Sequence, residues 1–343
     1  MKKQKNEIEI PLSVGLRGEY EIEVVDTNSG IIKHKRKEKN MIVDNAFSQI
    51  LGENVGMFSS TNYLGLFRDP AGASSHRVAC YVGSGGNPND ASMVTLQSRI
   101  TQRGPVSSGS FQSFSEAPYY TQRRFIFPAG SLNHTVREIG LGRNWANSDY
   151  LWTRVVLSPE IEVIPTDELR VTWRIYYDLP INNTWEGVMV GGQRDGITDV
   201  NWKLFISNAQ TTNFFTSHLA NGSALPGMFA TGNSRPVVRL GTSNEDSNLE
   251  SEWSIKGSSL FSGGTNNSFK SSEYSGEYPF SRTLEIGFEH NSPNNVQIGE
   301  MVVFRGDNGH QGESLFRITF NPVLDKAEFF RLFIKYRLTL TRS

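Results

Sequence analysis

The segment at residues 83–90, Gly-Ser-Gly-Gly-Asn-Pro-Asn-Asp, has the composition of a ligand-binding loop. Glycine-rich loops bind phosphate through backbone N–H groups where a strand leads into a helix, and the nucleotide-binding form ends in Lys-Ser/Thr. No such ending and no apolar helical pattern follows here. The Asn and Asp oxygens could hold a cation between chains, but they are equally typical of a turn between two strands. We favour the turn.

Histidine, cysteine and carboxylate residues show no catalytic or metal-binding pattern. The six histidines are scattered without a metal-ligand spacing, and the single cysteine, Cys80, excludes an internal disulfide. No Gly-x-Ser-x-Gly nucleophile motif is present, and no spacing of Asp and Glu predicts a hydrolytic pair. We therefore expect no catalytic residue, no cofactor and no metal, and a chain that is not an enzyme. A carbohydrate-active enzyme is an alternative that would need acidic residues gathered in a cleft.

Two segments, residues 169–179 and 330–340, share one alternation of apolar and polar residues. A period of two is that of a β-strand with one buried face. Three further pairs of segments match in the same order: 79–83 with 237–241, 136–141 with 298–303, and 152–159 with 315–322. The shared order and phase predict an internal duplication. Two unrelated β-domains with similar strand patterns are the alternative.

Three charged pairs recur in the matched segments: Glu138 with Glu300, Arg154 with Arg317, and Arg170 with Arg331. We interpret them as groups that hold strands and neighbouring chains, not substrates. Basic side chains on the polar face of a strand discourage uncontrolled edge pairing and also suit ion pairs between subunits. The candidate inter-subunit contacts are Arg154, Arg170, Arg174, Arg317, Arg331 and Lys335.

Composition favours an all-β protein with two tandem, internally duplicated β-sandwich domains after a small N-terminal hairpin and helix. Only 37% of the 343 residues are hydrophobic, and Ser, Asn, Thr and Gly are abundant, as expected for short strands joined by turns. Lys plus Arg (34) balances Asp plus Glu (35), so we expect no nucleic-acid partner. No secretion signal or membrane-spanning apolar run is visible, which predicts a soluble chain without membrane insertion, assembled in a cytoplasm.

Turn signals divide the chain into four predicted parts. Residues 1–55 hold a hairpin and a short helix that begins at Asp44, and we interpret them as a docking segment. The first β-sandwich repeat covers residues 56–182, an insertion covers 183–224, and the second repeat covers 225–343. The Ser- and Gly-rich stretch at residues 257–277 is predicted to be an exposed loop.

Several aromatic residues could stack on a glycan or anchor a protein interface. They are Tyr119, Tyr120, Trp145, Trp185 and Trp202. Packing within a sheet explains such residues as well, and we favour packing.

Motifs in the first half of the chain point to a known class of protein. They lie at residues 18–33, 40–45, 82–86, 123–130 and 136–142. With these motifs the chain resembles structural proteins of tailed bacteriophage virions over about residues 18–180. The second repeat departs more and lacks the Phe-Pro-Ala-Gly element found in the first.

The resemblance implies a non-enzymatic building block of a phage tail, neck (collar) or baseplate. Such a protein would sit in the virion, contact other virion proteins, and form a homo-oligomer in a ring or another symmetric assembly. A receptor-binding tail fibre or adhesin is the alternative, with the second repeat and residues 257–277 contacting a host surface glycan. A fibre shaft would show heptads, and no heptad run is present.

Overall fold

The computed structural model describes most of the chain, and every structural statement below concerns these residues. They are 5–51, 76–104, 112–114, 118, 120–145, 148–178, 184–189, 199–205, 237–242, 259–263, 268–275, 277–288, 296–304, 314–326 and 331–343. They form strands almost throughout, with one short helix, α1 (Asp44–Leu51). The all-β prediction is confirmed.

The first group of strands, module 1, contains two sheets. One sheet consists of β5 (Gln112–Phe114), β6 (Tyr120–Phe127), β9 (Asp167–Asp178) and the second half of β1 (Lys5–Asp26), in that order. The other consists of β4 (Arg99–Arg103), β3 (His76–Gly83), β7 (His134–Trp145), β8 (Ser148–Val163) and the end of β2 (Ile32–Ile42). The sheets face each other, because the buried indole Nε1 of Trp173 on β9 lies 3.3 Å from Cys80 Sγ on β3.

The second group, module 2, also contains two sheets. One consists of β14 (Ser268–Ser275), β15 (Phe280–Phe288), β18 (Arg331–Arg342) and the first half of β1. The other consists of β10 (Thr184–Met189), β11 (Val200–Phe205), β17 (Ser314–Lys326), β16 (Val296–Phe304), β12 (Val237–Gly241) and β13 (Ser259–Gly263). Residues from both sheets belong to one buried hydrophobic cluster.

The two modules repeat one order of strand pairing. β4-β3-β7-β8 in module 1 corresponds to β13-β12-β16-β17 in module 2, and β6-β9 corresponds to β15-β18. The segments matched in the sequence fall on β3 with β12, β7 with β16, β8 with β17, and β9 with β18. This agreement favours the predicted duplication.

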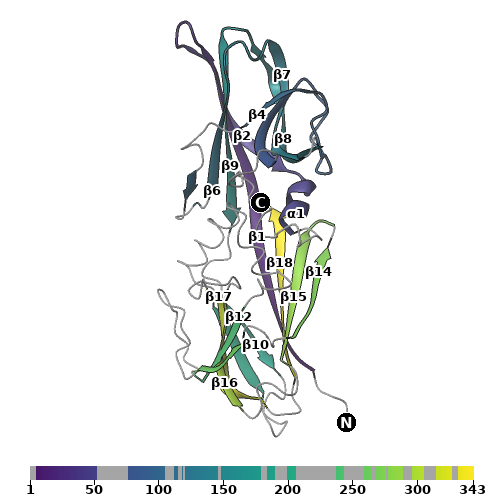
Figure 1. Ribbon diagram of the computed structural model, residues 1–343, viewed down its shortest axis with the longest axis vertical. Coiled ribbons are helices and arrows are strands. Elements are labelled where there is room, and N and C mark those ends of the chain that lie inside the picture. Colours follow the sequence, from purple (N-terminus) through teal and green to yellow (C-terminus); the bar gives the residue numbers. More distant parts are fainter. Residues whose placement is uncertain are drawn as a thin grey trace.

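β1 runs through both modules and along most of the molecule (Figure 1). Residues 5–16 pair in parallel with β18, and residues 15–26 pair antiparallel with β9. β2 pairs with β1 from Gly18 onward, on the edge that β18 leaves at Leu16. We predicted residues 1–55 as a docking segment of their own, whereas the hairpin supplies strands to both modules and is part of their sheets.

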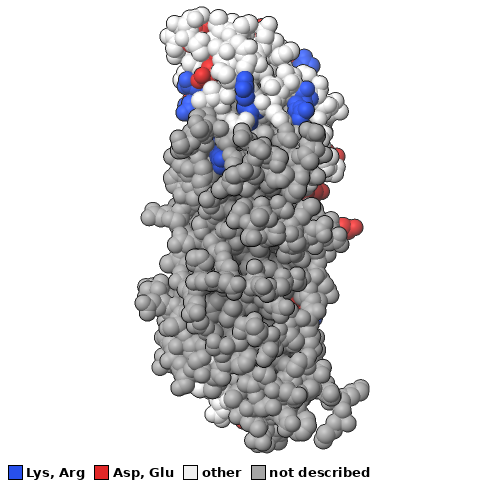
Figure 2. Space-filling view, in the orientation of Figure 1, with Lys and Arg blue, Asp and Glu red and all other residues white. Residues whose placement is uncertain are grey.

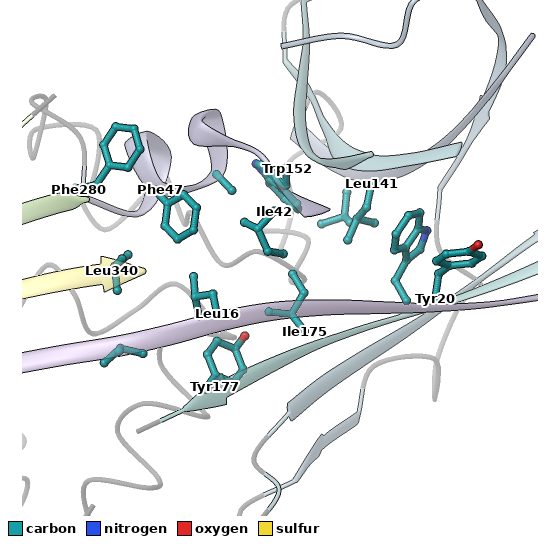
Figure 3. Close-up of a cluster of buried hydrophobic side chains, with 14 of the residues drawn as sticks. Leu16, Tyr20, Ile42, Phe47, Leu141, Trp152, Ile175, Tyr177, Phe280 and Leu340 are labelled. Atoms are coloured by element: carbon teal, nitrogen blue, oxygen red, sulfur yellow. The ribbon is translucent and has the colours of Figure 1, made fainter. Parts of the chain in front are cut away.

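The hydrophobic core follows the alternation predicted for a half-buried strand. In β9, Leu169, Val171, Trp173 and Ile175 are buried and alternate with partly exposed residues. The core continues between the modules, where Leu16 on β1, Phe47 on α1 and Leu340 on β18 lie close together (Figure 3). No polar layer separates these three side chains, so the described core is shared.

One local prediction differs from the structure, and the predicted insertion, which we expected to hold an extra hairpin, joins a sheet. Residues 257–277 contain β13 and β14, so the prediction of an exposed loop was wrong. Ser and Gly favour turns, but pairing with β12 and β15 overrides that local preference. The predicted insertion at 183–224 contains β10 and β11, and β11 pairs with β17. This hairpin therefore extends the sheet of module 2.

α1 is short and amphipathic. Of the helices in the described part of the chain, none has the length and apolar character needed to cross a lipid bilayer.

Candidate functional site

A buried ion pair organises the face of module 1 where the glycine-rich segment lies. Glu138 on β7 and Arg154 on β8 are both 0% exposed, and Arg154 Nη2 lies 2.8 Å from Glu138 Oε2. The antiparallel register pairs Arg154 with Gly140, two residues from Glu138, so the two side chains point to the same face of adjacent strands. A buried charge is tolerated when it is paired and hydrogen-bonded, and both conditions hold here.

The Glu138–Arg154 pair holds the connection between β3 and β4. Glu138 accepts hydrogen bonds from the backbone N–H groups of Gly85, Gln97 and Ser98 at 3.2, 3.1 and 2.7 Å. Arg154 donates to the carbonyl oxygens of Asn87 and Pro88 and to the side chain of Asn89. Within the glycine-rich segment, the Gly85 N–H therefore already binds a carboxylate of the chain itself, and the N–H groups of Ser84 and Asn87 donate to Ser98 O and to the Gln97 side chain.

Glycine is required in this loop by the close approach of Glu138. A Cβ at Gly85 would lie 2.5 Å from Glu138 Oε1, and one at Gly83 would lie 2.6 Å from the same atom. Gly86, by contrast, has open space around it. The composition of residues 83–90 thus follows from a loop that closes over a buried carboxylate.

Module 2 has an ion pair at the matched position. Glu300 on β16 and Arg317 on β17 are 0% and 1% exposed, with Arg317 Nη2 2.9 Å from Glu300 Oε2. The sequence predicted that the recurring Glu and Arg pairs hold strands, and both pairs join neighbouring strands. Arg154 and Arg317 are also two of the predicted inter-subunit contacts, and that part stays a prediction. In the single chain, both side chains are buried within a module.

The outer face of the β2–β1–β9 sheet carries three rows of charge. Alternation along β1 places Glu19, Glu21 and Glu23 opposite the buried face. Lys37 and Lys35 on β2 lie 3.0 Å from Glu19 and 3.2 Å from Glu21, on one side of this row. On the other side, Arg174 on β9 lies 3.2 Å from both Glu19 and Glu21.

The charged state of these rows is favoured by the groups around them. Burial favours the neutral form of Glu21, but hydrogen bonds from Lys35 and Arg174 outweigh it and lower the pKa of this carboxyl. Hydrogen bonds to Glu23 and Glu21 raise the pKa of Lys35. Burial opposes the charge of Arg174, yet Glu21 and Glu19 raise its pKa. The Glu21 carboxylate and the side chains of Lys35 and Arg174 therefore all carry their charge near neutral pH.

The other predicted contact residues lie on β9 and β18. Arg170 pairs with Glu168 at 2.6 Å, and Lys335 lies 3.5 Å from Glu285. The backbone of Arg331 begins β18, and its side chain lies outside the described residues. A contact of Arg170, Arg174, Arg331 or Lys335 with a second copy stays a prediction.

One end of module 1 forms a rigid tip with exposed apolar side chains. Ile31, Ile32 and Ile164 are 63%, 49% and 37% exposed at the β1–β2 and β8–β9 turns. Thr27 N–H donates to Thr166 O at 3.0 Å, which ties the two turns together. This tip is the upper end of the molecule in Figure 1, where the β1–β2 hairpin projects.

Hydrogen bonds of Asp26 stiffen the tip. Its carboxylate accepts from the N–H groups of Asn28 and Ser29, and Lys33 lies 3.0 Å from it. The bond from Ser29 N–H and the bond from Lys33 lower the pKa of Asp26 to about 2. In the orientation of Figure 2, the described surface at this end carries both basic and acidic residues. The apolar side chains at the tip are therefore held on a fixed frame of mixed charge.

The C-terminal strand ends in a set of contacts that join the modules. Arg342 donates from Nε to the carbonyl of Ile42 at 2.7 Å and pairs with Asp44 at the start of α1. Its guanidinium carbon lies 4.5 Å from the centre of the Tyr278 ring. The backbone N–H of Ser343 donates to Leu16 O at 3.1 Å. The end of module 2 is thereby fixed on the start of α1.

Of the predicted exposed aromatics, Trp202 lies beside a hollow in module 2. The hollow has a volume of about 490 Å³. Its lining comes from β10, β11 and β17, namely Glu186, Gly187, Val188, Asn201, Trp202, Lys203, Thr319 and Asn321. The indole packs over Gly187, whose added Cβ would lie 2.6 Å from the ring. Trp202 is partly buried against the core, so packing explains part of its placement.

The other predicted aromatics are less informative. Tyr120 is half-buried and packs on Tyr176, with ring centres 5.0 Å apart. Tyr119 and the side chains of Trp145 and Trp185 lie outside the described residues. In the ranges that the structure covers, no three His, Cys, Asp or Glu side chains are near enough to share a metal ion.

Comparisons of the chain with protein families, with curated proteins and with solved structures found no match. The site must therefore be understood from its own geometry.

Two features escaped the sequence reasoning. The first half of β1 was not predicted as a strand, although Ile8, Ile10, Val14 and Leu16 keep the period of two. The role of Arg342 had no visible signal, because its partners on β2 and α1 lie almost a full chain length away.

Proposed function

We propose that this chain is a non-enzymatic structural component of a tailed-phage virion, which forms or decorates the tail, the neck (collar) or the baseplate. The observation that carries the proposal is β1, a 22-residue strand that links two β-modules into one elongated body (Figure 1). Identical elongated bodies can pack side by side around a symmetry axis. The motifs that resemble virion proteins at residues 18–45 fall on β1, β2 and α1.

The tip of module 1 is the surface best suited to contact other virion proteins. Ile31, Ile32 and Ile164 present apolar side chains on turns that hydrogen-bond to each other. A rigid apolar surface loses little conformational entropy when it is covered. Copies of the chain would contact each other through the outer sheet faces, which carry Arg170, Arg174 and Lys335.

A double substitution at the tip tests the proposal. Ile31→Lys with Ile32→Lys places charge on exposed positions and should leave the fold intact. We expect the variant to be absent from purified virions that incorporate the unchanged chain, as detected by immunoblot and immunogold imaging. Val94→Lys is the matched control, because Val94 is also exposed (54%) but is not part of the tip. Absence of the unchanged chain from virions would contradict the whole proposal.

An adhesin that binds a host surface glycan is the second candidate function. The hollow supports it, because its lining includes Trp202, Asn201 and Asn321, and aromatic and amide side chains are groups that bind a sugar by stacking and hydrogen bonding. Glycan-array binding by the full chain, lost in Trp202→Ala and kept in Val94→Lys, would favour this candidate. Binding unchanged by Trp202→Ala would exclude the hollow as the glycan site.

A further inference from the structure

The first half of β1 belongs to module 1 by sequence but packs into module 2. We call residues 5–14 the arm. The arm and the two residues after it pair with β18 in parallel, from Lys5 opposite Arg331 to Leu16 opposite Arg342. From Gly18 onward, β1 lies between β2 and β9 of module 1. One strand therefore has two separate sets of partners.

The arm takes a place that module 2 does not fill from its own sequence. In module 1, β9 lies between β6 and the strand of its own hairpin, β1, which runs antiparallel to it. In module 2, β18 lies between β15 and the arm, which runs parallel to it. Among the described residues, the corresponding hairpin strand, β10, pairs with β11 and not with β18. Module 2 thus uses a strand that comes from outside it.

The groove that receives the arm is specific for an alternating strand. Ile8, Ile10 and Val14 of the arm are at most 1% exposed. On β18, Ile334 and Leu340 are fully buried in the same core. Backbone groups along β18 bind the arm whatever its sequence, and the apolar side chains on alternate positions select it. Glu9 on the opposite face lies 3.3 Å from Arg337, which helps to set the register.

Glycines stand where the arm meets module 1. Gly15 leaves room for Ser343 and Asp178, and Gly18 leaves room for the side chain of Asn40. They bracket the point at which the partner of β1 changes from β18 to β2. Glycine adopts a wider range of backbone conformations than any other residue, so the chain can change direction at these two positions. A change of backbone direction between Gly15 and Gly18 would let the arm leave its groove while β1 stays paired with β2 and β9.

We propose that the arm is exchanged between copies, so that the arm of one chain pairs with β18 of a second copy of this chain. Each copy carries the same arm and the same groove, so an exchanged arm makes the contacts of an unexchanged one. Neighbouring copies at high local concentration then become joined by a strand of the sheet, without a new interface sequence. The proposal rests on the strand register and does not depend on the chain being a virion protein.

Two variants of the full chain, each with one added cysteine, test the exchange. Ser13 and Thr339 are paired across the arm and β18, and Ser13 is exposed. Ser13→Cys and Thr339→Cys chains, carrying tags of different mass, are co-expressed, purified and treated with a short thiol crosslinker. Exchange predicts a band of twice the chain mass that contains both tags. The native Cys80 is fully buried, and burial raises the pKa of its thiol to about 12, so it stays unreactive.

Two controls make the outcome decisive. The double variant Ser13→Cys with Thr339→Cys, expressed alone and kept dilute, reports that the register permits crosslinking. Thr172→Cys replaces Thr339→Cys as the matched negative control, because Thr172 pairs with Glu21, well beyond the arm on β1. A mixed-tag band for the first pair and not for the control supports exchange. Single-chain bands alone, with the double variant crosslinked within one chain, overturn it.

Discussion

Modules 1 and 2 share a strand order and a buried Glu–Arg pair, but they differ in the strand beside their long C-terminal strand. Module 1 uses the second half of β1, from its own hairpin, against β9. Module 2 uses the first half of the same strand against β18, while its own hairpin strand β10 stays in the other sheet. Module 1 therefore completes its sheet with a strand of its own hairpin, whereas module 2 completes its sheet with the first half of β1, which continues into module 1.

Removal of residues 1–14 should break this comparison most strongly. Burial of Ile8, Ile10 and Val14 contributes about 5–9 kcal/mol at about 1.5–3 kcal/mol for each side chain. We expect module 2 to lose its fold while module 1 keeps its own, because β9 and β2 still hold β1 from Gly18 onward. Limited proteolysis with mass spectrometry should cleave after residue 183 and spare residues 76–178. Equal protection of both modules would show that module 2 is complete without the arm.

Truncation of the buried arginines should reveal how alike the modules are. Arg154→Ala and Arg317→Ala each leave a buried carboxylate without its partner, which costs about 3–5 kcal/mol of unfolding free energy. Urea unfolding monitored by fluorescence measures both. Arg137→Ala is the matched control, because its pair with Glu160 is exposed and worth less than about 1 kcal/mol. A loss as small as that of the control would mean that neither pair supports its module.

The loop of module 1 gives a sharper test of the role of Glu138. Gly85→Ala places a methyl group 2.5 Å from Glu138 Oε1, and we expect a loss of about 1–3 kcal/mol from forced shifts. Gly86→Ala, where nothing lies within 4 Å, should change the stability by less than about 1 kcal/mol. Hydrogen exchange of the Gln97 and Ser98 amides should accelerate only in the first variant. Equal changes in stability and in amide exchange in the two variants would mean that contact with the Glu138 carboxylate does not explain the glycine at position 85.

The smallest effect is expected from acid at the tip of module 1. The pKa of Asp26 is lowered to about 2 in the folded chain, against about 4 for an unfolded aspartate. A folded-state pKa below the unfolded one stabilises the fold above about pH 4, and this contribution is lost as the pH falls toward 2. Asp26→Asn should therefore lower the urea midpoint at pH 7 and have less effect near pH 2. A difference in urea midpoint that is independent of pH would exclude the charge of the Asp26 carboxylate as the cause of the lost stability.

Much of the fold could be predicted from local pattern. The alternation in β9 marked its buried face, and the order of matched segments marked equivalent strands in the two modules. The arm was missed because Pro11 and charged neighbours weaken its strand pattern and its partner lies at the opposite end of the chain. Residues 257–277 were misjudged because composition reports turn preference and not the pairing of β13 and β14.

The sequence indicated which residues form the buried ion pairs, but not that they are buried. From the recurrence of Glu138 with Glu300 and of Arg154 with Arg317, we predicted that these residues hold strands and neighbouring chains. The burial of these side chains was not predicted, because Glu and Arg are seldom fully buried. Alternation along a strand also does not reveal whether its polar face is covered by a loop. The exposed tip was also invisible, since two apolar residues after a turn resemble the start of any buried strand.

The pairing of β1 with β18 also sets the order of events during synthesis. The arm leaves the ribosome before β18, which follows 326 residues later in the register of Lys5 with Arg331. At about 5–20 residues per second, the arm waits roughly 16–65 s for its partner. Throughout that interval Ile8, Ile10 and Val14 have no β18 to cover them. The nascent chain therefore carries an uncovered apolar strand until β18 is made.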